Sequence, residues 1–172
     1  MEYLAKAADI SACCAYRYTL TRRWGDSSEP GKTVAWVGLN PSVADADLDD
    51  PTIRRVVGFT QAWGYTRAVM LNLFAFRATD PDVLKLIEHN TDVVGPRNDD
   101  VIRREAAAAD LVVAAWGTRG VLLGRDRAVA KLLAEVGVAP HCLQVTKDGH
   151  PKHPLYCRGD LAPVPYTPKG PS

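Results

Sequence analysis

Four short apolar runs, each ending at a polar side chain or a tight turn, constrain the fold of this chain most strongly. Runs of this kind are typical of strands buried on both faces of a parallel sheet. Helical patterns separate them, and strands that alternate with helices form doubly wound sheets. We therefore predict an α/β fold with three α/β/α layers and a mostly parallel central sheet of about four strands. The four runs are Thr33–Leu39, Arg67–Phe74, Leu111–Ala115 and His141–Val145.

The remaining elements follow from caps and periodicity. Alternation of Tyr16, Tyr18 and Leu20 against Arg17, Thr19 and Thr21 predicts a half-exposed strand over Tyr16–Trp24, at an edge of the sheet. Caps and stop signals predict four helices. These are Pro51 to Gly64 with Asp50 as N-cap, Asp80 to Ile87, Asn98 or Asp99 (as the cap) to about Ala109, and Arg125 to Val136 before Gly137.

Length and composition narrow the class of protein. We predict one domain over residues 1–172, with a loose tail at 168–172. Residues 1–10 lack the apolar core of a secretory signal, and no run is long enough to span a membrane, so we expect a cytoplasmic protein. The net charge of +1 leaves nucleic-acid binding open without demanding it.

No cofactor is predicted. The first strand is not followed by G-x-G-x-x-G, and the chain lacks the P-loop motif, so neither phosphate cradle is present. Cys13, Cys14, Cys142 and Cys157 contain no C-x-x-C pair, which favours reduced thiols and small buried side chains over an iron–sulfur cluster. No metal site is predicted.

The carboxyl ends of the four strands carry the functional signal. In open α/β sheets ligands bind outside this edge. The first strand delivers Asn40 in Gly38-Leu39-Asn40-Pro41-Ser42, the second delivers Asn72, the third ends at Trp116-Gly117, and the fourth leads into a loop with His150 and His153. These four strand ends predict one composite pocket.

In this order, the motifs resemble those of the uracil-DNA glycosylase superfamily. Gly38 to Ser42 is similar to the first motif of its mismatch-specific branch, and Leu71-Asn72 to the strand end that reads the base. Val112–Gly117 and His153–Tyr156 resemble the Trp-Gly strand and the His-Pro motif of its main uracil branch. Over residues 16–157 the chain also resembles a bacterial domain family of unknown function, DUF1643.

The resemblance implies a DNA glycosylase-like enzyme that hydrolyses the N-glycosidic bond of a uracil-type or modified pyrimidine. Asn40 would position water and His153 would stabilise the leaving base. Its partner would be DNA or a nucleotide with the target base extruded into the pocket. The implied substrate-binding residues are Gly38, Leu39, Pro41, Ser42, Asn72, Phe74, Trp116, His150, Leu155 and Tyr156. The main uracil branch has aspartate where Asn40 stands, which implies slower chemistry here.

Several alternatives remain open at this point. Asn40 is also suited to an Asx-type turn, Asn72 to a loop cap, Asp50 and Thr52 to a helix cap, and Trp116, Phe74 and Phe76 to the core. The same fold could serve as a non-catalytic module that binds a nucleobase, nucleotide or DNA. A third hypothesis is a metal-dependent hydrolase built from His150, His153 and the acidic segment Asp45–Asp50. That segment would repel a phosphate backbone unless it faces elsewhere. The base preferred and the oligomeric state are not predicted.

Overall fold

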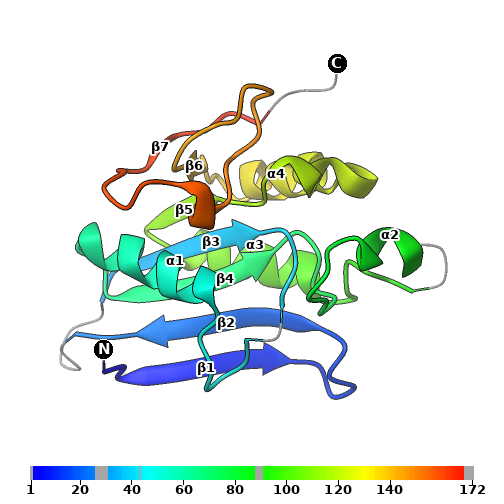
Figure 1. The fold of residues 1–172 in the computed structure, drawn as a ribbon, viewed down its shortest axis with the longest axis horizontal. Helices are drawn as coiled ribbons and strands as arrows, with labels where there is room; N and C mark the ends of the chain where they lie inside the picture. Colours follow the sequence, from blue (N-terminus) through cyan, green and yellow to red (C-terminus); the bar gives the residue numbers. More distant parts are fainter. Residues whose placement is uncertain (1, 26–30, 43, 88–90, 169–172) are drawn as a thin grey trace.

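The computed structural model describes residues 2–25, 31–42, 44–87 and 91–168. Within them the chain forms one seven-stranded mixed sheet in the order β1-β2-β4-β3-β5-β6-β7 (Figure 1). The strands are β1 (Ala5–Ile10), β2 (Arg17–Arg23), β3 (Thr33–Gly38), β4 (Arg67–Asn72), β5 (Leu111–Ala114), β6 (His141–Cys142) and β7 (Val164–Pro165). The helices are α1 (Pro51–Ala62), α2 (Val83–Ile87), α3 (Asn98–Ala108) and α4 (Arg125–Glu135), with 3-10 segments η1 (Thr118–Gly124) and η2 (Pro154–Tyr156).

The centre of the sheet is parallel, as predicted. Strands β4, β3, β5 and β6 pair in parallel and lie within the four predicted runs, although β6 has two residues where the prediction gave five. The α/β class is confirmed, but the predicted sheet of about four strands was too narrow. Antiparallel β2 and β1 extend one side and antiparallel β7 the other. Because β1 pairs with β2, the strand predicted at an edge lies inside the sheet.

The strand order determines where the helices lie. The chain passes from β3 through α1 to β4 and then returns to the opposite side of β3 to form β5. Crossovers of one hand place their helices on opposite faces when the direction of travel reverses. Accordingly, Val34 and Trp36 of β3 pack with α1, whereas Ala35 and Val37 pack with α3 and α4. Figure 1 shows α1 in front of the sheet and α3 behind it.

Local signals predicted one helix start correctly and another incorrectly. Asp50 caps α1, since its carboxylate accepts from the backbone N–H of Ile53 at 2.8 Å. The cap predicted at Asn98 or Asp99 is wrong: Arg97 occupies the N-cap of α3, and its side chain makes no capping bond. Asn98 is instead buried, and its amide donates to backbone carbonyls at the end of β4.

The cysteines are free thiols: Cys13 and Cys14 are exposed, and Cys142 and Cys157 are buried in the apolar clusters on the two faces of the sheet. The predicted tail falls almost wholly at residues 169–172, outside the described residues. A helix long and apolar enough to cross a membrane is not found in the described part of the chain.

Candidate functional site

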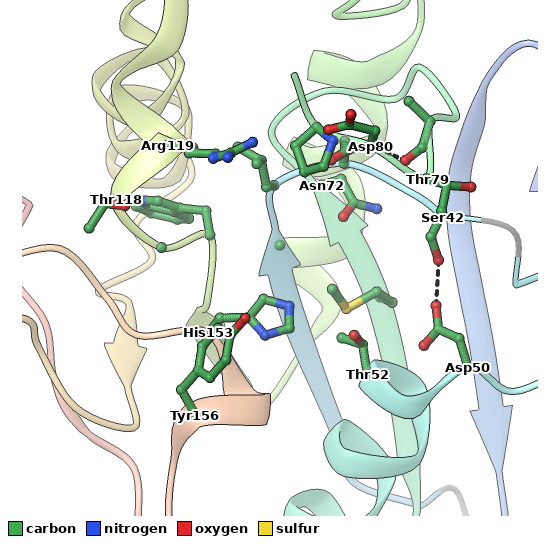
Figure 2. A pocket seen from close by; sticks show the side chains of 18 of the residues that line it. Ser42, Asp50, Thr52, Asn72, Thr79, Asp80, Thr118, Arg119, His153 and Tyr156 are labelled. Atoms are coloured by element: carbon green, nitrogen blue, oxygen red, sulfur yellow. Dashed lines mark hydrogen bonds between the residues drawn. The ribbon is translucent and has the colours of Figure 1, made fainter. Parts of the chain in front are cut away.

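A cavity of about 580 Å³ opens at the carboxyl ends of the central strands. Its wall includes Gly38 at the end of β3, Asn72 at the end of β4 and Trp116 just after β5. These strands surround the point where the strand order reverses, which is where ligands bind in open α/β sheets. In Figure 2, His153 and Tyr156 lie on one side of the cavity and Ser42 and Asp50 on the other, with Asn72 between them.

Asn72 presents a fixed polar group to this cavity. It is 2% exposed, and its Nδ2 has no hydrogen-bond partner among the described residues. The strand end that carries it is held by the Asn98 amide, which donates to the carbonyls of Asn72 at 3.0 Å and Leu73 at 3.1 Å. Gly38 leaves room for the side chain, because a Cβ there would lie 2.9 Å from Asn72 Oδ1. A buried donor without a partner costs stability, so this amide is poised for a ligand.

Asn40 lines the cavity but is partly committed to the turn. Its Nδ2 donates to the carbonyl of Pro41 at 3.1 Å and to that of Ala78 at 2.8 Å. These bonds tie the loop after β3 to the segment after β4, which supports the turn role left open by the sequence. An amide carries an acceptor beside its donor, so Oδ1 of Asn40 can still orient a water molecule.

His153 enters the cavity from the loop that precedes η2. Its Nδ1 accepts from the backbone N–H of Leu155 at 3.3 Å, so the neutral imidazole carries its proton on Nε2. Burial lowers the pKa of His153 below its ordinary value, and the charge of Asp50 opposes that shift. The Arg55 guanidinium on α1 donates to the carbonyls of Pro154 and Cys157 and fixes this turn. The site therefore holds a neutral imidazole with one N–H donor available.

Three carboxylates of the acidic segment Asp45–Asp50 hold the local structure, and one of them, that of Asp50, also lines the cavity. Asp45 accepts from the backbone N–H groups of Asp47 and Leu48, and Asp49 pairs with buried Arg22 at 2.7 Å. Asp50 caps α1 and accepts from Ser42 Oγ at 2.5 Å. In the described residues no group of three His, Cys, Asp or Glu side chains is placed to hold a metal ion. The hydrolase hypothesis with His150, His153 and this segment thus lacks its ligand set there.

The cavity collects most of the candidate residues but not all. Gly38, Leu39, Asn40, Ser42, Asn72, Trp116, His153 and Tyr156 line it. Phe74 is fully buried in the core, Pro41 is buried in its turn, Leu155 is 44% exposed, and His150 binds Thr146 Oγ1 through its backbone N–H. Phe76 packs edge-on against Tyr16.

The aromatic side chains of the cavity wall are therefore Trp116 and Tyr156, and not the phenylalanines. Trp116 is 2% exposed and packs edge-on against Tyr166, with ring centroids 6.0 Å apart. Tyr156 is 79% exposed, and its ring centroid lies 5.8 Å from that of His153.

Sequence reasoning missed the cations of the cavity, which are Arg17, Arg119 and Lys152. Arg119 pairs with Asp82 at 3.1 Å, and Lys152 donates to Gln144 Oε1 at 3.1 Å. Arg17 was assigned to the solvent side of a strand, but it is 3% exposed. Its position just after Tyr16, where the chain enters a strand, gave no local sign of this burial.

These observations define an α/β protein with a polar, partly cationic cavity at the carboxyl ends of its parallel strands. The sequence matches the DUF1643 family, described as a protein of unknown function, over residues 17–155. The chain belongs to this family. Neither a search of curated proteins nor a search of solved structures gives a match.

Proposed function

We propose that the cavity binds a pyrimidine-type nucleobase and that the protein hydrolyses its N-glycosidic bond, in a DNA glycosylase-like reaction. The observation that carries this proposal is the buried Asn72 amide, whose Nδ2 has no partner among the described residues and which lines the same cavity as His153 and Asn40. The position of the cavity adds support, because it lies at the carboxyl ends of the parallel strands, where open α/β sheets bind their ligands.

Each of the three side chains has chemistry suited to one part of the reaction. In glycosidic cleavage the leaving base gains negative charge and the sugar gains positive charge. The Nε2–H of His153 can donate to the departing base, as an oxyanion-hole donor does. The Asn72 amide offers a donor and an acceptor, which match the adjacent carbonyl and N–H of a uracil edge. Asn40 Oδ1 can orient water but cannot act as a strong base, so we expect slow turnover.

The direct test is an assay for base release. The protein is incubated with single- and double-stranded oligonucleotides that carry uracil or modified pyrimidines, and abasic sites are cleaved with alkali. We expect product from the wild type and a loss of about 10²–10³-fold in His153→Ala and Asn72→Asp, since each removes the N–H donor of the side chain. Arg104→Gln, on the exposed side of α3, is the matched control. Complete absence of product from folded protein across the panel would contradict hydrolysis.

A second candidate is a nucleobase- or nucleotide-binding module without turnover. It is favoured by one observation: Asn40 spends both of its donors on backbone carbonyls, as a structural turn residue does. Binding of deoxyuridine measured by calorimetry, abolished in Asn72→Ala and accompanied by no base release, would select this candidate. Product formation would exclude it.

The protonation state of His153 gives an independent check. Because burial holds its folded-state pKa below 6.5, the unfolded chain takes up the proton first as the pH falls. This part of the stability is therefore present above pH 6.5 and is lost as the pH falls from there through the lowered pKa. We expect nuclear magnetic resonance to show a His153 midpoint below 6.5 with the proton on Nε2. A midpoint above 6.5 would contradict the burial argument.

A further inference from the structure

Arg17 is a buried cation in the cavity wall, and the described part of the chain gives it no ion pair. It is the first residue of β2, is 3% exposed, and lines the cavity. One terminal nitrogen donates to the backbone carbonyl of Ala44. Its Nε is buried and has no partner among the described residues. Within those residues no carboxylate lies within ion-pair distance of it.

The other buried arginines show what such a side chain normally requires. Arg22 pairs with Asp49 at 2.7 Å, and Arg125 pairs with Asp99 at 2.7 Å. A guanidinium removed from water needs an anion and filled hydrogen bonds to offset its desolvation. The Asp50 charge favours the protonated form of Arg17 from a distance, but its carboxylate is already bound by Ser42 and the backbone of Ile53. Arg17 is therefore the buried arginine whose anion is missing.

The anion can come from the ligand. A guanidinium presents a fork of donors that fits phosphate oxygens, and the cavity adds Lys152, whose recorded partner is the neutral Gln144. At about 580 Å³ the cavity lies within the roughly 300–1,000 Å³ range of sites for small ligands. A base at Asn72 would bring its sugar phosphate into the same cavity.

We propose that Arg17 forms an anion subsite that receives the phosphate of a nucleotide whose base lies at Asn72 and His153. This inference rests on the proposed function for the identity of the base. The phosphate belongs either to a free mononucleotide or to a strand from which the nucleotide is extruded.

The test compares ligands with and without the phosphate. Calorimetry measures the binding of 2′-deoxyuridine, its 5′-monophosphate and a single-stranded oligonucleotide with one deoxyuridine, and thermal melting measures the effect of inorganic phosphate. We expect the monophosphate to bind about tenfold or more tightly than the nucleoside, as for a hydrogen bond to a charged group. In Arg17→Gln this ratio should fall to about one with nucleoside binding retained, and phosphate should no longer raise the melting temperature.

Controls separate this subsite from folding and from catalysis. Arg17→Lys keeps the charge and should retain part of the ratio, whereas Arg104→Gln, which removes an exposed charge, should retain all of it. Circular dichroism checks that each variant is folded. If only the oligonucleotide loses affinity in Arg17→Gln, the phosphate belongs to a strand.

Failure of the anion subsite and failure of the proposed hydrolysis give different results. An equal affinity of the wild type for nucleoside and monophosphate, with no effect of phosphate on melting and no loss of oligonucleotide affinity in Arg17→Gln, would overturn the subsite, whatever the base-release assay gives. A phosphate effect that Arg17→Gln abolishes, together with no base release, would leave the subsite standing and contradict hydrolysis.

Discussion

Two arginines of one strand, Arg17 and Arg22, are buried to nearly the same extent but lie in different surroundings. Arg22 is 1% exposed and donates to the Asp49 carboxylate and to the carbonyls of Thr21, Asp45 and Leu48. Arg17, five positions earlier and 3% exposed, donates to the Ala44 carbonyl and leaves its Nε without a partner in the described residues.

This difference indicates that the surroundings of Arg22 serve the fold and that those of Arg17 serve ligand binding. Around Arg22 the acidic segment supplies the Asp49 carboxylate and the carbonyls of Asp45 and Leu48, so the charge of this guanidinium is balanced within the protein. Arg17 lines the cavity, and no carboxylate of the described residues pairs with it. Burial lowers the pKa of Arg17 to about 10, so the guanidinium still carries its charge at neutral pH. A buried charge retained without an anion indicates function more strongly than one with its pair.

The largest effect is expected from Arg22→Met. Removing one member of a buried pair leaves the other uncompensated, which typically costs about 3–5 kcal/mol. Here the Asp49 carboxylate would lose its cation and keep only the hydrogen bond from the Tyr3 hydroxyl, and three backbone carbonyls would lose the Arg22 donor. We expect urea denaturation to show that loss in the free energy of unfolding. A loss below about 1 kcal/mol would show that the Arg22 network is not a structural centre.

Substitutions at Asp50 should have the next largest effect on the free energy of unfolding. They should act both on the start of α1 and on the surroundings of Arg17. Asp50→Ala removes the N-cap of α1, which costs about 1–2 kcal/mol in denaturation experiments. Asp50→Asn keeps a capping oxygen and should cost little. Since it also removes a negative charge that acts on Arg17, it should tighten the binding of inorganic phosphate. Weaker phosphate binding in Asp50→Asn would place the anion away from Arg17.

Arg17→Met is expected to behave unlike Arg22→Met. It removes a desolvated charge that has no ion pair in the described residues, at the expense of one hydrogen bond to Ala44. The free energy of unfolding should stay the same or rise by up to about 1 kcal/mol, because apolar replacements of buried charges are often neutral or stabilising. The same denaturation experiment measures it. A loss as large as that of Arg22→Met would mean that Arg17 serves the fold and not a ligand.

The fold could be predicted where side chains carry the signal. The central strands were found because every residue of β3 is buried, which produces an unbroken apolar run. Strand β1 was missed because it is exposed or half-buried along its length and is held by backbone pairing with β2. Strand β7 has two exposed residues, which are too few to form a recognisable sequence pattern. Backbone pairing at the sides of a sheet leaves little trace in the sequence.

The same distinction explains what could be predicted about the site. Asn72 and His153 were identified because strand ends meet at one edge of a parallel sheet. Arg17 was missed because period-two alternation assigned it to the solvent side, whereas its guanidinium donates to the carbonyl of Ala44, which lies 27 positions away. Phe74 was named as a substrate-binding residue because of the resemblance, but it is fully buried in the core. Local patterns locate the strand ends, and tertiary contacts decide which side chains reach the cavity.

The smallest effect is expected at Asp47, the exposed member of the acidic segment. Asp47 makes hydrogen bonds through its backbone: its N–H donates to Asp45, and its carbonyl accepts from Lys6. Asp47→Asn should therefore change the free energy of unfolding by less than about 0.5 kcal/mol and leave phosphate binding unchanged. If Asp47→Asn instead tightens oligonucleotide binding as much as Asp50→Asn tightens phosphate binding, the outer face of this segment meets the ligand. The ligand-binding surface would then extend past Arg17 to include the acidic segment around Arg22.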